Sequence, residues 1–215
     1  MRQHRLDVRR SLALAMLGRF DEAQSIMRDV RTKAAERGGG FALAYVLGQA
    51  STELALLAGD PTAAAESSSE AMRLYDEFGE RGFASTAAGR LGQALYELGR
   101  LDEAETWAGR AAELGASDDA WTQMLWRQVK AKVLARRAEH AEAERLAREA
   151  LAIGEETDLL NSVADAYGDL GEVLALAGRA DEAAAASAEA LARYECKENL
   201  VMAERTRARL AQNPA

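Results

Sequence analysis

Apolar and polar positions along the chain follow helical spacing, and the pattern recurs about every 40 residues. Its clearest copies read LGRLDEA at 98–104 and AGRADEA at 177–183. Each copy is centred on one small residue, and these anchors stand 39 to 41 residues apart, at Gly18, Gly59, Gly99, Ala138 and Gly178. A period of this length is typical of solenoids, in which each unit buries its apolar face only against its neighbours.

Small residues occupy fixed places on both sides of every anchor. Seven residues before the anchors stand Ser11, Thr52, Gly92, Ala131 and Gly171, and five residues after them stand Ala23, Ala64, Ala104, Ala143 and Ala183. Small side chains at these two places let the axes of two consecutive helices approach closely. We therefore predict a tightly packed helical hairpin around each anchor.

The anchor itself is expected to end the first helix of each pair. Glycine adopts the left-handed conformation at little cost, and that conformation commonly terminates a helix. Asp21, Asp102 and Asp181 then stand where the second helix begins, and their carboxylates suit its free N–H groups and its dipole. Each repeated phrase is therefore predicted to be the turn of a helical hairpin.

The same periodicity predicts where the helices lie. The first helices of the pairs are expected at 5–17, 41–58, 82–98, 119–137 and 159–177. The second helices are expected at 21–37, 61–78, 102–114, 140–155 and 181–195. A last helix at 198–211 carries Leu200, Ala203 and Leu210 on one side, which is typical of a polar cap on the open end of a solenoid.

These helices group into one superhelical domain spanning residues 1–215. Its repeats are expected at 4–40, 41–80, 81–118, 119–157 and 158–197, followed by the cap helix. No comparable cap precedes the first helix. We therefore expect either that the chain was cut from something longer or that its first hairpin packs against another copy.

The hairpin pattern resembles the tetratricopeptide repeat (TPR). In the third unit the matching residues are Leu91, Gly92, Leu95, Gly99, Asp102, Glu103, Ala104 and Ala111; in the fifth they are Tyr167, Leu170, Gly171, Leu174, Gly178, Asp181, Glu182, Ala183 and Ala190. The first, second and fourth units depart from it, with Arg10, Ser51 and Lys130 in place of a leucine. The period exceeds the usual ~34 residues, which implies longer helices. The resemblance implies an all-α, right-handed solenoid of about five TPR-like hairpins.

Composition narrows the class of protein further. Proline occurs only at 61 and 214 and isoleucine only at 26 and 153, which favours helices over strands. The net charge of −8 disfavours nucleic acid and anionic membranes as partners. Cys196 is the only cysteine, so no disulfide can form within the chain. We find neither a secretory signal nor a run of about 18 apolar residues, so we expect a cytoplasmic protein.

The residues that could carry catalysis are scattered. His4 and His140 lie in different repeats, and the glycines at 38–40 lack the strand and the Gly-Lys-Ser/Thr that a phosphate loop requires. The acidic pairs 118–119 and 155–156 precede predicted helices, where capping explains them. We therefore predict that the chain is not an enzyme and requires no cofactor or metal.

The TPR resemblance implies a concave groove lined by the first helices, which bind an extended peptide or a partner's helix. The groove residues it implies here are Gln49, Glu53, Arg90, Gln93, Tyr96, Glu97, Gln128, Lys132, Arg136, Asp165, Asp169 and Glu172. The first helix of the fourth hairpin (119–137) is basic on this side and that of the fifth (159–177) is acidic. Together they would suit a partner of mixed charge, or the two would pair internally. Trp126 is expected to wedge into the preceding hairpin, with Trp121 partly exposed.

The stretch from Trp121 to Ala183 also resembles the C-terminal repeat regions of large bacterial signalling proteins, in which a nucleotide cyclase or DNA-binding module and a STAND-type ATPase precede the repeats. No cyclase, ATPase or DNA-binding residues are present here.

Two hypotheses follow. The first is a protein–protein interaction scaffold with a partner segment in its groove. The second is a regulatory domain that senses a ligand or peptide and changes its superhelical shape on binding.

Overall fold

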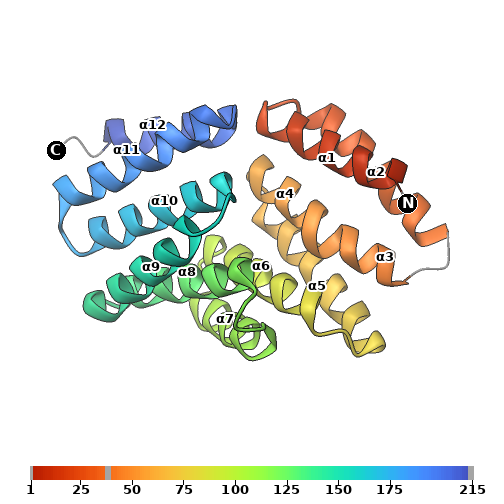
Figure 1. Cartoon of the computed structure of the whole chain (residues 1–215), viewed down its shortest axis with the longest axis horizontal. Helices are drawn as coiled ribbons and strands as arrows, with labels where there is room; N and C mark the ends of the chain where they lie inside the picture. Colours follow the sequence, from red (N-terminus) through yellow and green to blue (C-terminus); the bar gives the residue numbers. More distant parts are fainter. Residues whose placement is uncertain (1, 37–39, 213–215) are drawn as a thin grey trace.

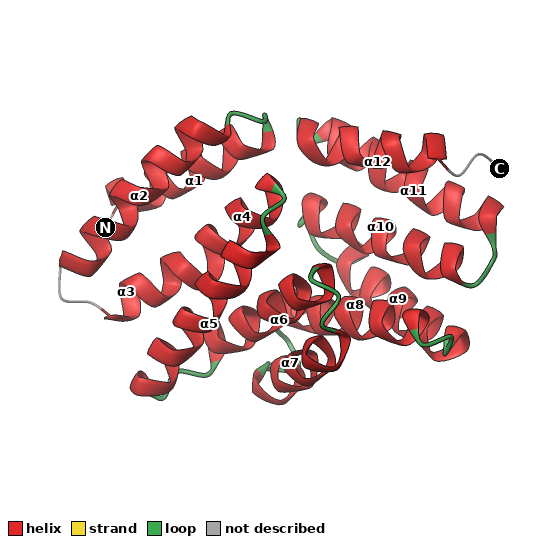
Figure 2. Cartoon of the chain, turned by 180° about the vertical axis from the view of Figure 1, so that it is seen from behind, coloured by secondary structure: helices red, strands yellow, loops and turns green. Residues whose placement is uncertain are grey.

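The computed structural model describes residues 2–36 and 40–212, and these residues form helices joined by short turns (Figures 1 and 2). The helices are α1 (Arg2–Met16), α2 (Phe20–Glu36), α3 (Gly40–Tyr45), α4 (Thr52–Ala58), α5 (Pro61–Phe78), α6 (Gly82–Glu97), α7 (Leu101–Leu114), α8 (Ala120–Arg136), α9 (His140–Glu155), α10 (Leu160–Leu176), α11 (Ala180–Cys196) and α12 (Leu200–Gln212). Consecutive helices pack as hairpins along an arc, so the predicted all-α solenoid is confirmed.

Each predicted helix boundary lies within three residues of the observed one. One feature that the periodicity did not predict is a π-helical segment, η1 (Val46–Ser51), which joins α3 to α4 in one continuous rod. The hydroxyl of Thr52 donates to the carbonyl of Leu47, five residues earlier, at 2.9 Å. Gly48 lies inside η1, where an added Cβ would stand 3.0 Å from the Cβ of Ala71, so this segment packs directly against α5.

All five anchors have the left-handed conformation predicted for them. Their φ angles are 78° at Gly18, 76° at Gly59, 73° at Gly99, 63° at Ala138 and 77° at Gly178. The glycine loop predicted at 38–40 lies outside the described residues except for Gly40, which begins α3.

The predicted N-terminal caps are observed only in part. Asp119 accepts from the backbone N–H of Thr122 at 3.2 Å, so the 118–119 pair does cap α8. Asp102 and Asp181 lie in the first turns of α7 and α11, but neither helix has a side-chain hydrogen bond at its cap. There the arginine of the phrase pairs with the glutamate three residues later instead, as in Arg100–Glu103 at 2.7 Å.

The prediction that the other acidic pair, at 155–156, caps the helix that follows it is wrong. Glu155 is the last residue of α9, and its carboxylate accepts from the hydroxyl of Tyr167 at 2.6 Å. The turn that follows α9 displaces the start of α10 to Leu160, so this pair ends one helix rather than beginning the next.

We expect Ala138→Gly to stabilise the protein by about 1 kcal/mol, because holding a left-handed backbone costs a residue with a side chain roughly that amount. Ala138 is the one non-glycine anchor, with φ 63°. Urea denaturation of the variant beside wild type measures the gain. An unchanged midpoint would show that the fourth turn is held without strain. Gly99→Ala should lower the midpoint, because the added methyl group meets no atom within 4 Å and the only effect left is the cost of the left-handed backbone.

Close packing within each hairpin follows the small residues that the repeat predicted. Ala23, Ala64, Ala104 and Ala143 are fully buried. A Cβ at Gly92 would stand 3.1 Å from the carbonyl oxygen of Ala104. The two helices of the first hairpin also come close at the equivalent positions, where the hydroxyl of Ser11 donates to the carbonyl of Ala23 at 2.7 Å. The two positions that carry small residues in every repeat are therefore where the helix backbones meet.

The two ends of the arc meet each other. Helix α12 covers α11, as predicted for a cap, and it also reaches α1 and α4, which the sequence does not predict. Arg205 donates to the carbonyls of Leu56 and Leu57 at 3.2 and 2.7 Å, and Met202 packs against the apolar cluster of the first hairpins. Figures 1 and 2 both show one end of α12 facing the turn of the first hairpin, and the contacts between α1 and α12 close the solenoid on itself.

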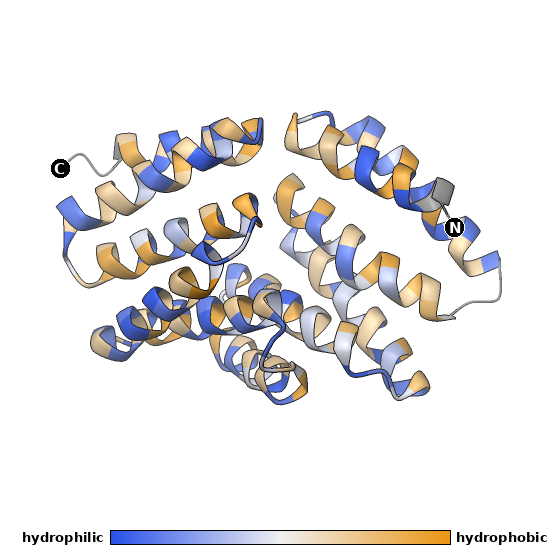
Figure 3. Cartoon of the chain, in the orientation of Figure 1, coloured by the Kyte–Doolittle hydropathy of each residue, from blue (hydrophilic) through white to orange (hydrophobic). Residues whose placement is uncertain are grey.

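The rod from Gly40 to Ala58 is long and apolar enough, by length and composition alone, to cross a membrane, with a mean hydropathy of 1.4 over its most apolar window. The expectation that no stretch approaches the length and apolarity of a membrane span is therefore wrong by this measure, since the sequence pattern predicts the rod only as the first helix of the second hairpin. Half of that window is buried, and Ala44, Leu47, Ala50 and Leu54 belong to the apolar clusters shared with neighbouring helices. Figure 3 shows the same rod as one of a set of helices with mixed hydropathy. Its apolar character is that of a core helix.

Candidate functional site: the inner face of the arc

Except for Gln49 and Gln128, which line neither of the hollows described below and have no hydrogen bond or ion pair to the others within the described residues, the predicted groove residues come together on one surface, which we call the inner face. They lie on η1 and α4 (Gln49, Glu53), α6 (Arg90, Gln93, Tyr96, Glu97), α8 (Gln128, Lys132, Arg136) and α10 (Asp165, Asp169, Glu172). Arg90, Tyr96, Gln128 and Lys132 are buried, whereas Glu97 and Arg136 are exposed and the others are half-buried. The structure therefore separates the buried members of the predicted set from the accessible ones.

Lys132 is the centre of a buried ion cluster. Its ammonium lies 2.9 Å from Asp169 and 3.9 Å from Glu97, and 4.7 Å from the centre of the Tyr96 ring. Burial works against the charge of Lys132, but the carboxylates of Asp169, Glu172 and Glu97 outweigh it and raise its pKa. The charged form is therefore held in place, and α8 pairs internally with α10 through this lysine.

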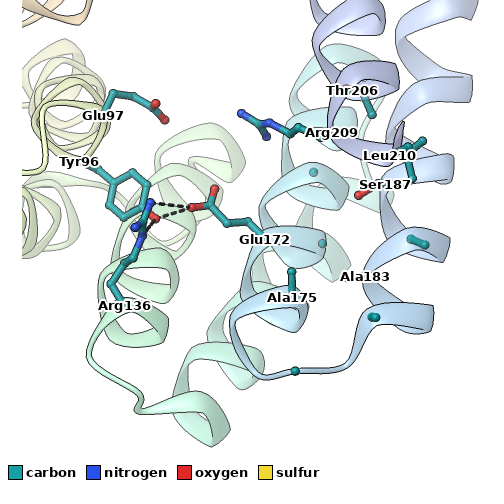
Figure 4. Close-up of a pocket in the computed structure, with 15 residues that line it drawn as sticks. Tyr96, Glu97, Arg136, Glu172, Ala175, Ala183, Ser187, Thr206, Arg209 and Leu210 are labelled. Carbon is teal, nitrogen blue, oxygen red and sulfur yellow. Dashed lines mark hydrogen bonds and ion pairs between the residues drawn. The ribbon is translucent and has the colours of Figure 1, made fainter. Parts of the chain in front are cut away.

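Tyr96 connects three helices through its hydroxyl. The hydroxyl donates to Glu172 at 2.5 Å and accepts from Nε of Arg136 at 3.0 Å, as Figure 4 shows. Burial, together with the negative charge of Glu172, raises the pKa of Tyr96 to about 12. Tyr96 therefore stays protonated and acts as a fixed polar bridge, while the guanidinium of Arg136 remains half in solvent.

Arg90 is buried on the inner face with incomplete partners. Its guanidinium reaches Glu53 at 3.3 Å and Gln93 at 3.4 Å, both long for hydrogen bonds, and it lies 5.6 Å from the centre of the Trp121 ring. Its Nε atom has no hydrogen-bond partner among the described residues. Buried donors are normally satisfied, so this position retains unused binding capacity.

Asp165 is held by a tyrosine rather than by a cation. The hydroxyl of Tyr194 donates to its carboxylate at 2.5 Å. Burial raises the pKa of Asp165 to about 6, and the nearby charges of Asp169 and Glu53 add to this effect while Arg90 opposes it. Asp165 therefore carries a poorly compensated charge at neutral pH.

Two hollows open along the inner face, one on each side of Glu97 and Arg209, which line both. The first, of about 460 Å³, is walled by small residues of α10 and α11, among them Gly171, Ala175 and Ala183. Figure 4 shows Glu97, Glu172 and Arg209 pointing into it from three sides. The second, of about 430 Å³, lies between α4, α6, α10 and α12.

Residues of α12 are the part of this surface that reasoning from the sequence missed. Arg205 and Arg209 line the second hollow, although the sequence pattern predicts the last helix only as a cap. The signal available was the run of arginines on the polar side of that helix, which a cap does not require. Trp126 does wedge among three apolar clusters, and Trp121 is half-buried beside Arg90, as predicted.

Within residues 2–36 and 40–212, no group of three or more His, Cys, Asp or Glu side chains is arranged to hold a metal ion. His140 begins α9, and Cys196 is an exposed free thiol at the end of α11. The inner face itself presents charged and hydrogen-bonding groups, among them Glu97, Arg136 and Glu172, and such groups suit recognition of another polar molecule.

Comparison with known proteins supports the repeat architecture. Two models described as tetratricopeptide repeat match the chain, one at residues 85–115 and 129–157 and the other at residues 4–29. No curated protein gives a significant match. The matched segments are therefore similar to tetratricopeptide repeats. They include the third unit, as the hairpin pattern indicated, and also the first and fourth units, which depart from that pattern, whereas neither model matches the fifth.

Solved structures of similar fold cover most of the chain. A thermophilic TPR protein of Thermus thermophilus, TTC0263, is 21% identical with a TM-score of 0.64, covering 97% of this chain and 99% of its own. The type IV pilus biogenesis factor PilW is 15% identical with a TM-score of 0.59, covering 99% and 94%. BtubC of P. vanneervenii is 21% identical with a TM-score of 0.58, covering 85% and 75%. At these identities the likeness concerns the fold alone.

Proposed function

We propose that this protein is a non-catalytic interaction scaffold that binds a segment of a partner protein on its inner face. TPR proteins generally mediate protein–protein interactions, which supports the class of function. One observation supports the location: Glu97 and Arg136 are exposed beside the 460 Å³ hollow, and their own ion pairs, to Lys132 at 3.9 Å and to Glu172 at 3.8 Å, are long. By the resemblance of residues 121–183, we further propose that it is an arm of a cytoplasmic bacterial signalling regulator.

The partner segment that fits this surface carries both positive and negative side chains, and it packs against small residues of this protein. Lys132 and Asp169 neutralise each other at 2.9 Å. The charged side chains that remain accessible to a partner are Glu97 and Arg136, whose own ion pairs are long, and Arg209, which points into the hollow. The hollow beside them is walled by glycine and alanine, which lets a partner's backbone approach α10 and α11 closely.

A pull-down from host lysate tests this proposal, with the double variant Glu97→Ala/Arg136→Ala as bait beside wild type. We expect a partner recovered by wild type and lost by the variant. The matched control is Arg110→Ala/Glu113→Ala, which removes an exposed ion pair on α7 and should keep the partner. Lys132 is left intact because its removal would destabilise the site. Equal recovery by all three baits would refute binding at the inner face.

A second candidate function is a regulatory domain that senses a small ligand or peptide. The closure of the arc favours it, because Arg205 ties α12 to the end of α4 through two hydrogen bonds to carbonyls. Two arrangements of α12, latched and released, would give the shape change that sensing requires. A homodimer through the first hairpin also remains a prediction, and the exposed Leu6 and Leu17 of that hairpin are compatible with it.

A further inference from the structure

The second hollow has the size and setting of a small-molecule site. Its volume of about 430 Å³ falls within the range of ~300–1,000 Å³ that is common for ligand pockets. It lies beneath α12, with Glu53, Arg90, Asn161 and Asp165 on the facing helices. We call it the α12 hollow.

One side of the α12 hollow carries positive charge without a counterion. Arg205 uses its donors on two backbone carbonyls, and neither Arg205 nor Arg209 has a carboxylate within 4.0 Å among residues 2–36 and 40–212. Burial lowers the pKa of Arg205, and the like charge of Arg209 lowers it further. Glu97 lines the same hollow and its charge opposes this effect, but its carboxylate lies beyond 4.0 Å of both guanidinium groups.

The opposite side carries negative charge without a cation. Asp165 accepts one hydrogen bond from Tyr194, and no Lys or Arg nitrogen of the described chain lies within 4.0 Å of its carboxylate. The charges that face it are Asp169 on its own helix, Glu53 on α4 and Arg90 on α6, so two of the three repel it. Asp165 and the two arginines of α12 therefore line the hollow without forming an ion pair within 4.0 Å.

Buried hydrogen-bonding atoms at the hollow are also unsatisfied. Arg90, which is 8% exposed, leaves its Nε without a partner in the described part of the chain, and so does the side-chain oxygen of Asn161. Such atoms cost free energy in a structure unless something binds them. Arg90 and Asn161 line the hollow, so a molecule inside it can reach their side chains.

We propose that the α12 hollow binds a small zwitterion, with its carboxylate toward Arg205 and Arg209 and its ammonium group toward Asp165. This chemistry is shared by free α-amino acids and by short peptides. Such a molecule compensates both sides of the hollow at once, whereas an anion alone would leave Asp165 exposed to further negative charge. The inference rests on the sensing function proposed above as the second candidate, and it gives that function a site and a ligand class.

Occupancy of the hollow is coupled to the closure of the arc through Arg205. The same guanidinium holds α12 to the carbonyls of Leu56 and Leu57 and faces the ligand carboxylate. A bound carboxylate neutralises the repulsion between Arg205 and Arg209, and this favours the latched position of α12. The ligand therefore stabilises the closed form.

Thermal unfolding of the whole chain tests the proposal, with each of the common L-α-amino acids, diglycine and triglycine as probes in the millimolar range. At about 100 times its Kd, a true ligand should raise Tm by roughly 5–10 °C. The N-acetylated and amidated forms of the best probe carry only one charge each, and they should produce no rise. Free amino acids and glycine peptides form separate arms of the panel, so the stronger arm identifies the source of the zwitterion.

Two variants check the location. Asp165→Asn keeps an acceptor for Tyr194 but removes the charge that attracts the ammonium group, and it should abolish the ligand-induced rise. Arg209→Gln should weaken it at the carboxylate end. The exposed Asp76→Asn on α5 is the matched control and should keep the full rise. No rise with any zwitterion, an equal rise with the N-acetylated form, or an undiminished rise in Asp165→Asn would each overturn the proposal.

These outcomes are separable from those of the pull-down. Asp165→Asn leaves Glu97 and Arg136 intact, so a scaffold that uses the inner face still recovers its partner when the zwitterion site is lost. If the zwitterion fails in every arm while the pull-down succeeds, the scaffold function stands and the α12 hollow has no ligand of this class.

Discussion

Lys132→Met is expected to lower the free energy of unfolding by about 3–5 kcal/mol, because removing one partner of a buried ion cluster leaves the other charges uncompensated. Lys132 is 3% exposed, and its ammonium lies 2.9 Å from Asp169. Without it, Asp169 and Glu97 lose their cation, and only the half-exposed Arg136, 3.8 Å from Glu172, remains beside the cluster. Urea denaturation at neutral pH measures the loss.

A double variant separates the charge from the packing. Lys132→Met/Asp169→Leu removes both members of the closest pair, and replacing a buried pair by apolar residues of similar size is often neutral or stabilising. We therefore expect it to recover most of the loss. Burial and the charges of Glu172 and Glu97 already raise the pKa of Asp169 against the effect of Lys132, so the deficit of the single variant should also shrink as pH falls. A loss below about 1 kcal/mol in Lys132→Met would show that the cluster is solvated.

Asp165→Asn is expected to raise stability at pH 7.5 by up to about 3 kcal/mol, the free energy that corresponds to a carboxyl pKa of about 6 in the folded state against 3.8 in the unfolded chain. Above pH 6 the carboxylate is ionised in both states, and the folded state bears the full cost of its burial. As pH falls from 6 to below 3.8 the cost disappears, because the folded protein takes up the proton first.

The pH dependence makes this prediction specific. The advantage of Asp165→Asn over wild type should be largest above pH 6 and absent near pH 3.5, where both side chains are neutral. Asp76→Asn serves as the control and should show no such trend. A variant that is equally stabilised at both pH values would owe its gain to something other than the charge, and a destabilised variant would show that Asp165 gains more from Tyr194 than it loses by burial.

The two residues illustrate opposite uses of buried charge. Lys132 is compensated on several sides and holds α8 against α10, so its removal costs stability. Asp165 is left with one hydrogen bond, so it costs stability until something binds it. Binding sites commonly retain such unfavourable groups, since the ligand restores the missing interaction. This contrast is the physical basis for placing the ligand at Asp165 and the structural cluster at Lys132.

The sequence by itself determined the helical hairpins and their turns. The reason is local: small residues and left-handed turns are required wherever two helix backbones approach, so the need recurs in every repeat and leaves a period of about 40 residues. The alanines at 23, 64, 104 and 143 and the φ angles of the anchors follow directly from it. The same periodicity placed Arg90, Lys132 and Asp165 on one face, because residues on equivalent helices of a solenoid share a side.

Only the tertiary structure decided which of those groups are free. Whether Lys132 meets Asp169 at 2.9 Å or faces solvent depends on how far α8 stands from α10, and no spacing within one helix encodes that distance. The return of α12 to α4 depends on curvature summed over all the hairpins, in which small rotations at each interface add up. The sequence pattern therefore indicates only that Arg205 lies on the surface of a cap helix. In the folded protein the same residue forms the link that closes the arc.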